Sequence, residues 1–244
     1  THILFDCDNT LVLSEELAFE ACSELSNQIL ESNGVSARYT GHQLIVDFVG
    51  QNFRGMLNSL QEKHNFQLSQ EELERYVSME EDQVIAKFQE KLVPCKGVSE
   101  QLEKLAKSGK YTLAVVSSSA HRRVMASLVK AGQTSYFPPD RVFSAATSLE
   151  KPTSKPDPAI YLHACEKLDV APMSCVAVED SKSGSLSAIR AGIPVIAYVG
   201  SYDEVKREEM AKLLKDLGAA VVMYDWSEFE SCLETIGAPN FSSL

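Results

Sequence analysis

The chain has 244 residues, of which 44% are hydrophobic and 23% charged, as is typical of a globular protein with one large domain or two small ones. Its formal net charge of −11, without any run of lysines and arginines, argues against a nucleic-acid-binding protein. No stretch approaches the roughly 18 apolar residues of a membrane span. We therefore expect neither a nucleic acid nor a membrane as partner.

The six cysteines indicate a reducing compartment. They form no Cys-x-x-Cys pair and no Cys/His cluster, and several lie in apolar runs, where free cysteine behaves as a small hydrophobic residue. No signal peptide is visible in the printed sequence, which starts at Thr1 without a methionine. We expect a cytoplasmic protein, and a monomer, because no unusual apolar stripe is left over once core and insert are assigned.

The first ten residues carry the most specific chemical signal. The apolar run His2–Phe5 predicts a short buried strand, and Asp6 and Asp8 follow it, with Thr10 two residues later. The carboxyl end of such a strand borders the crevice where open parallel sheets bind ligands. Two close carboxylates repel each other unless a cation lies between them, and hard oxygen ligands suit Mg²⁺. The plain alternative is a turn, because Asp and Asn are common turn residues.

A helical pattern without any strand follows this motif. Ser69 and Glu72 match a capping box at the start of its last helix. We predict that residues 15–93 form an all-helical insert. The predicted helices cover residues 15–32, 41–48, 53–64 and 69–91.

From Pro94 onward strands alternate with helices, which predicts βαβ units and a parallel sheet. With the first strand, this pattern predicts an α/β, Rossmann-like three-layer core built from residues 1–14 and 94–244. The expected strands cover residues 111–116, 141–144, 175–178, 194–199 and 219–223. The expected helices cover residues 98–108, 121–131, 157–168, 183–191, 201–217 and 226–236.

Three polar motifs in the second half suit the same crevice. Ser117 ends an apolar strand, where a hydroxyl can hold an oxygen of a phosphoryl group. Lys155 can bring a carboxylate and a phosphate together by screening their repulsion, whereas Lys151 is expected outside the site. Glu179 and Asp180 follow a buried strand and can supply metal ligands. The plain alternatives are a loop serine, a solvated lysine at a helix start, and an acidic turn.

The order of the four motifs resembles that of the haloacid dehalogenase superfamily, in the subgroup whose helical cap follows the first motif. That subgroup contains sugar phosphatases and β-phosphoglucomutase. The resemblance covers the whole chain, with a core of residues 1–14 and 94–244 and a cap of residues 15–93. It implies a fold with a cap that closes over the site.

The resemblance also implies the role of each motif residue. Asp6 would be the nucleophile that becomes an aspartyl-phosphate, and Asp8 the acid/base. Ser117 would hold a phosphoryl oxygen, and Lys155 would balance the charge. The Mg²⁺ ligands would be Asp6, Asp8 through its backbone carbonyl, Asp180 directly, and Glu179 directly or through water. The expected substrate contacts are Thr10 and Ser118 in the core, and Gln51 and Arg54 in the cap loop 50–54.

We predict a Mg²⁺-dependent phosphatase of a small phosphorylated metabolite, namely a sugar, sugar-acid or polyol phosphate. The segments 5–8, 136–138 and 155–159 resemble those of bacterial 6-phosphogluconate phosphatases, which favours a sugar or sugar-acid phosphate. The first alternative is a β-phosphoglucomutase-like mutase, which needs strong cap cations, whereas loop 50–54 has one arginine and no lysine. The second is a non-catalytic binding or regulatory protein, against which the filled catalytic positions argue. The presence of Asp8 disfavours carbon–halogen chemistry.

Overall fold

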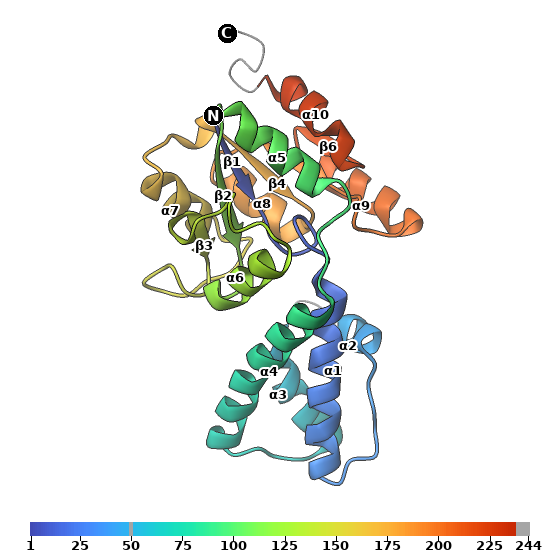
Figure 1. Cartoon of the computed structure of the whole chain (residues 1–244). Helices are drawn as coiled ribbons and strands as arrows, with labels where there is room; N and C mark the ends of the chain where they lie inside the picture. Colours follow the sequence, from blue (N-terminus) through green and yellow to red (C-terminus); the bar gives the residue numbers. More distant parts are fainter. Residues whose placement is uncertain (49–50, 238–244) are drawn as a thin grey trace. The chain divides into compact units, whose positions relative to one another are not determined.

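The computed structural model describes residues 1–48 and 51–237. The chain divides into a core unit, Thr1–Leu13 with Val93–Leu244, and a helical unit, Ser14–Leu92 (Figure 1). None of the helices within the described ranges is long and apolar enough to cross a membrane. Gly50, the first residue of the expected cap loop, lies outside the described residues.

The core unit is built on a six-stranded parallel sheet with the strand order β3-β2-β1-β4-β5-β6. This is a doubly wound order, and it confirms the predicted α/β class. β1 lies at the centre, where Phe5 pairs with Val115 of β2 and Val178 of β4. The strands are β1 (His2–Phe5), β2 (Thr112–Ser117), β3 (Val142–Ser144), β4 (Cys175–Glu179), β5 (Val195–Tyr198) and β6 (Val221–Met223).

Helices cover both faces of this sheet, because successive residues of a strand point to opposite sides. Leu4 packs with Ile160 and Leu214 in the cluster beneath α7, α8 and α9. Phe5 meets the rings of Phe137 and Trp226 on the other face, at centroid distances of 5.7 and 6.1 Å. The helices are α5 (Val98–Ser108), α6 (His121–Lys130), α7 (Ala159–Lys167), α8 (Lys182–Arg190), α9 (Glu204–Asp216) and α10 (Phe229–Ile236) (Figure 1).

The helical unit contains α1 (Glu15–Ser32), α2 (Gly41–Asp47), α3 (Phe53–His64) and α4 (Gln70–Lys91). Its own hydrophobic core includes Leu25, Leu44 and Leu57. The predicted capping box is confirmed, because the Ser69 hydroxyl accepts from the Glu72 N–H while the Glu72 carboxylate accepts from the Ser69 N–H. α2 ends one residue earlier than predicted.

Several predicted helices begin too early, and aspartate side chains explain two of these differences. The helix expected over 226–236 is α10, which starts at Phe229 after a 3-10 helix over Trp226–Glu228. The helix expected over 157–168 is α7, which starts at Ala159 because the Asp157 carboxylate accepts from the Ala159 N–H at 2.9 Å. The helix expected over 201–217 is α9, which starts at Glu204 after Asp203 caps it by accepting from the Lys206 N–H. Aspartate favours the position before a helix because its carboxylate satisfies an unpaired N–H of the first turn.

Candidate active site

The turn after β1 brings Asp6 and Asp8 to the carboxyl edge of the sheet. The Asp6 N–H extends the strand ladder by donating to the Val178 carbonyl at 2.9 Å. Asn9 then adopts a left-handed conformation with φ +57°, which asparagine tolerates better than most residues. Cys7 is fully buried, and burial raises the pKa of its thiol, which disfavours the thiolate that a cysteine nucleophile needs.

Serines after β2 hold this edge together. The Ser119 hydroxyl donates to Asp8 Oδ2 at 2.8 Å, and the Ser119 N–H donates to Ser117 Oγ at 3.0 Å. Ser144 Oγ in turn donates to the Ser119 carbonyl at 2.8 Å. Sequence reasoning placed Ser117 here and missed Ser119, whose only signal was the run of three serines at the strand end.

Lys155 connects the first and last motifs. Its Nζ lies 2.6 Å from Asp6 Oδ1, 2.6 Å from Glu179 Oε1 and 2.7 Å from the Val116 carbonyl. Burial alone lowers the pKa of this ammonium, but the charges of Asp6 and Glu179 outweigh it and raise the pKa above its ordinary value. Lys151, in contrast, is exposed.

Glu179 is fully buried, and its two carboxylate oxygens differ. Oε1 accepts from Lys155 and also from the hydroxyl of Tyr161, which sequence reasoning missed. Oε2 has no hydrogen-bond partner within the described ranges. It lies against Gly184, where an added Cβ would be 1.7 Å from it, so only glycine leaves room for the carboxylate. Burial raises the pKa of Glu179 to about 7, against the opposing charge of Lys155.

Asp6, Glu179 and Asp180 offer ligand atoms within 4.8 Å of one another. All three are buried, and burial also raises the pKa of Asp6. Buried carboxylates beside one ammonium, with Oε2 of Glu179 unpartnered, fit a hard divalent cation such as Mg²⁺. The Asp8 carboxylate is outside this group, so its backbone contact with a metal stays a prediction.

Asp180 has a further neighbour on the loop after β5. The Tyr202 hydroxyl lies 3.2 Å from the Asp180 carbonyl oxygen and 3.3 Å from Asp180 Oδ2. Tyrosine hydroxyls thus contact both acidic residues of the fourth motif. Neither tyrosine lies in one of the four sequence motifs. Each contact joins segments about 20 residues apart, so the sequence does not show it locally.

The predicted substrate contacts in the core lie at the same edge but differ in their bonding. Ser118 Oγ accepts from the Lys155 N–H at 3.1 Å. Thr10 is fully buried, and its hydroxyl has no hydrogen-bond partner in the part of the chain that is described, so it gives Asp8 no direct hydrogen bond.

The predicted contacts in the helical unit are bonded within that unit. The Ser59 hydroxyl donates to Gln51 Oε1 at 3.0 Å. The Arg54 guanidinium donates to both carboxylate oxygens of Glu74, at 2.8 and 2.5 Å. These partners belong to α3 and α4, and the guanidinium fork of Arg54 is therefore engaged by a carboxylate of the same unit.

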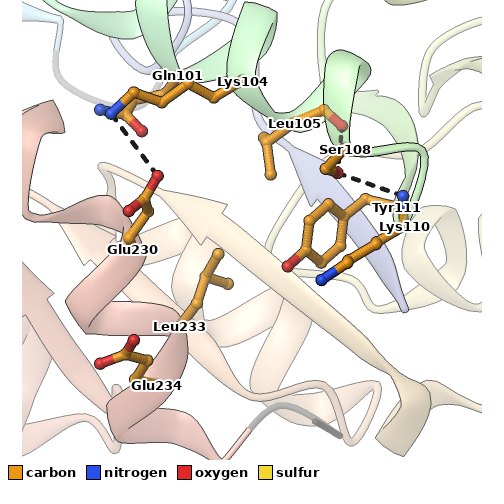
Figure 2. Close-up of a pocket in the computed structure, with 9 residues that line it drawn as sticks. All are labelled: Gln101, Lys104, Leu105, Ser108, Lys110, Tyr111, Glu230, Leu233 and Glu234. Atoms are coloured by element: carbon orange, nitrogen blue, oxygen red, sulfur yellow. Dashed lines mark hydrogen bonds and ion pairs between the residues drawn. The ribbon is translucent and has the colours of Figure 1, made fainter. Parts of the chain in front are cut away.

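A cavity of about 200 Å³ lies elsewhere, between α5, α10 and the residues before β2 (Figure 2). Its lining carries both charges, and Lys104 Nζ lies 3.6 Å from Glu230 Oε1 across it. It contains none of the predicted site residues. Tyr111 precedes β2, so the cavity borders the amino edge of the parallel sheet, opposite the carboxylates.

Comparison with known proteins relates the whole site to one family. The family pattern of haloacid dehalogenase-like hydrolases matches residues 3–198. A phosphorylated carbohydrates phosphatase of Thermotoga maritima is 32% identical over 228 residues, covering 88% of this chain and 98% of that protein. A 6-phosphogluconate phosphatase of Escherichia coli strain K12 is 29% identical over 201 residues, covering 80% of this chain and 81% of that protein. A solved haloacid dehalogenase-like protein of unknown function from Agrobacterium tumefaciens matches with TM-score 0.72 and 26% identity, covering 96% of this chain and 98% of that one.

Proposed function

The chain belongs to the haloacid dehalogenase-like hydrolase family, and we propose that it is a Mg²⁺-dependent phosphatase acting through an aspartyl-phosphate. One observation carries the proposal: a buried lysine ammonium bonded to the Asp6 and Glu179 carboxylates at the carboxyl edge of the sheet. Such an ammonium lets an anionic nucleophile approach an anionic phosphate, because it lowers their repulsion in a site of low dielectric.

In the proposed first step, Asp6 attacks the phosphorus atom. A bond forms between phosphorus and a carboxylate oxygen of Asp6, while the bond to the leaving oxygen of the substrate breaks. Ser117 supports this step with a donor. Its oxygen already accepts from the Ser119 N–H, which leaves its own hydrogen for a phosphoryl oxygen. Lys155 holds Asp6 in place through the second oxygen of the carboxylate group, Oδ1.

Asp8 is the proposed acid and base. It gives a proton to the leaving oxygen in the first step, and in the second step it takes a proton from the water that hydrolyses the aspartyl-phosphate. The hydrogen bond from Ser119 supports this role by fixing one oxygen of Asp8. The other oxygen is then presented in a defined direction for the proton.

The proposed cation ligands are Asp6, Glu179, Asp180 and the backbone carbonyl of Asp8, and the grouping of three buried carboxylates supports them. When bound, Mg²⁺ neutralises charge on the phosphoryl oxygens. The helical unit is the proposed cap that excludes bulk water. Six buried free cysteines support a cytoplasmic location, and we keep the monomer as the proposed state.

The proposed substrate is a sugar or sugar-acid phosphate, with a polyol phosphate as the nearest variant. The named activities of the two curated relatives support this class. Thr10, Ser118, Gln51 and Arg54 stay the predicted contacts of the substrate. Arg54 would have to exchange Glu74 for a carboxylate or phosphate of the substrate, which suits its bidentate geometry.

The test is release of inorganic phosphate from a panel of phosphorylated sugars, sugar acids, polyols and nucleotides, with Mg²⁺ or with EDTA. We expect Mg²⁺-dependent release, lost in Asp6→Asn and kept in Asp140→Asn, a matched change at an exposed position. Acid-quenched reactions should contain a phosphorylated peptide that includes Asp6. Absence of release from every compound by folded protein would refute the phosphatase. Conversion of β-glucose 1-phosphate only in the presence of a bisphosphate primer would establish the mutase instead.

A further inference from the structure

Among the residues that the structure describes, Tyr161 is the one neutral donor to the buried Glu179 carboxylate. The Tyr161 side chain is fully buried in α7, and its hydroxyl reaches across to β4. A tyrosine at this position could fill the core with its ring alone. The hydroxyl instead donates to Glu179 Oε1, the same oxygen that receives the Lys155 ammonium.

Both donors come from one segment that is anchored to the neighbouring helix. Lys155 precedes α7, and Tyr161 lies in its first turn. Ser187 Oγ of α8 donates to the Asp157 carbonyl at 2.6 Å, and Arg190 donates to the Pro156 carbonyl at 3.0 Å. The segment therefore presents the ammonium and the phenol to Oε1 together.

This arrangement restricts the rotation of the carboxylate. Two donors hold Oε1, and the close approach of Gly184 limits the space around Oε2. Oε2 itself has no hydrogen-bond partner within the described parts of the chain. A buried carboxylate oxygen without a donor is unfavourable unless another group satisfies it.

We propose that Tyr161 is a positioning residue for the metal: its hydroxyl holds Glu179 in the one orientation that leaves Oε2 for a cation shared with Asp6 and Asp180. This inference rests on the proposed Mg²⁺ site. Partners that orient a metal-binding side chain typically change metal affinity by about 10- to 100-fold when they are removed. The Lys155 ammonium also bonds Asp6 and the Val116 carbonyl, and the Tyr161 hydroxyl gives Oε1 a second anchor.

The variant Tyr161→Phe isolates the hydroxyl. Phenylalanine keeps the ring, including its contact with Lys155 Nζ at 5.3 Å from the ring centroid. The matched control is Tyr198→Phe, which removes another buried tyrosine hydroxyl, one that faces the Cys95 thiol. Mg²⁺ binding to each metal-free protein, without substrate, is measured by titration calorimetry.

We expect Tyr161→Phe to raise the dissociation constant of Mg²⁺ about tenfold or more, and Tyr198→Phe to leave it unchanged. Tyr161→Phe should also need more Mg²⁺ for half-maximal phosphate release, yet recover most of kcat at saturating Mg²⁺ with an unchanged KM for substrate. A role in packing alone would lower thermal stability without moving the Mg²⁺ dissociation constant.

The outcomes separate this inference from the proposed function. Equal Mg²⁺ affinity of wild type and Tyr161→Phe would overturn the inference alone. Failure of the wild-type protein to bind Mg²⁺ at all would overturn the proposed function, and the inference with it. Equally weakened Mg²⁺ binding in Tyr161→Phe and Tyr198→Phe would overturn the inference alone, because the effect would then not depend on the bond to Glu179.

Discussion

The ion pairs of Lys155 in the core unit and of Arg54 in the helical unit differ sharply in burial. In the core unit, the side chains of Lys155, Asp6 and Glu179 are only 4%, 11% and 0% exposed. In the helical unit, Arg54 and Glu74 are 37% and 52% exposed although their bonds are equally short. Exposed pairs contribute little to stability because water screens them. Buried pairs carry a desolvation penalty that can exceed their attraction, so their presence points to a task other than stability.

The carboxyl pKa values show the same contrast. Hydrogen bonds from Lys87 and Arg54 lower the pKa values of Glu20 and Glu74 in the helical unit. Burial raises the pKa values of Asp6 and Glu179 in the core unit, although a lysine touches both. Burial therefore decides the direction of the shift. A carboxylate group that is hard to ionise without a cation is well suited to bind one.

The largest expected effect comes from removing the buried ammonium. Lys155→Met leaves Asp6 and Glu179 without their shared cation, and we expect a loss of about 3–5 kcal/mol in the free energy of unfolding. Phosphate release should fall below detection. Lys151→Met, at an exposed position four residues earlier, should change the free energy of unfolding by less than about 0.5 kcal/mol. Urea denaturation measures both, and similar losses in the two variants would contradict the contrast between buried and exposed charges.

A smaller effect is expected from adding one methyl group beside the same carboxylate. Gly184→Ala places a Cβ 1.7 Å from Glu179 Oε2, and we expect a loss of about 1–3 kcal/mol in unfolding free energy together with weaker Mg²⁺ binding. Gly55→Ala in α3 is the matched control. Its nearest neighbours would lie 3.5 Å away, and alanine favours a helix by up to about 1 kcal/mol. The midpoints of thermal denaturation should move in opposite directions in the two variants. A stabilised Gly184→Ala would refute the close approach of Glu179 Oε2 to Gly184.

The pH dependence of the metal-free protein should be more modest. The ordinary pKa of glutamate is 4.5, and the pKa of Glu179 in the folded protein is about 7. Between these two pH values, the folded protein keeps a proton on Glu179 that the unfolded chain has lost. Stability therefore falls as pH rises through this window, and the loss is complete above about pH 7. Asp6, whose pKa is also raised, acts in the same direction. His2, whose pKa is lowered by burial, acts in the opposite direction.

Glu179→Gln isolates this contribution. The difference in urea midpoint between Glu179→Gln and wild type, both in EDTA, should change across pH 5–7, because the variant lacks the carboxyl group that titrates there. The carboxylates of the helical unit should act in the other direction and lower stability only as pH falls below their unfolded values. A pH-independent difference would show that Glu179 titrates normally.

The smallest effect on stability is expected at the exposed pair. Arg54→Ala and Glu74→Gln should both leave the unfolding midpoint almost unchanged, because both side chains are well exposed to solvent. Substrate kinetics should separate them. Arg54→Ala should raise KM severalfold if the guanidinium binds the substrate, whereas Glu74→Gln frees the guanidinium and should not. An unchanged KM in Arg54→Ala would remove Arg54 from the substrate contacts.

The sequence identified the residues at strand ends better than the bonds between them. Apolar runs that end in Asp6, Ser117 or Glu179 mark the carboxyl edge of a parallel sheet, so their meeting could be predicted from strand position alone. Lys155 was recognisable by its proline-flanked motif. The strand order β3-β2-β1-β4-β5-β6 could not be read from the pattern, because each pairing joins segments that are distant in sequence.

Hydroxyl partners were missed for a different reason. Tyr161 occupies a buried position in α7 that a helical pattern assigns to the core, and nothing local shows where its hydroxyl points. Ser119 follows β2 as one of several serines, and its bond to Asp8 spans 111 residues of sequence. The Arg54 pair with Glu74 likewise depends on how α3 meets α4, so its partner could not be chosen from the sequence.

The central place of β1 has a consequence for the order of folding. β1 is synthesised before its partners β2 and β4, which begin only at Thr112 and Cys175. The helical unit, Ser14–Leu92, is one continuous stretch of the chain, so it can form while β1 still lacks its neighbouring strands. Contacts between residues so far apart in sequence slow folding, because a long loop must close before any of them forms. The nucleophile therefore takes up its final surroundings late, when the fourth strand docks beside the first.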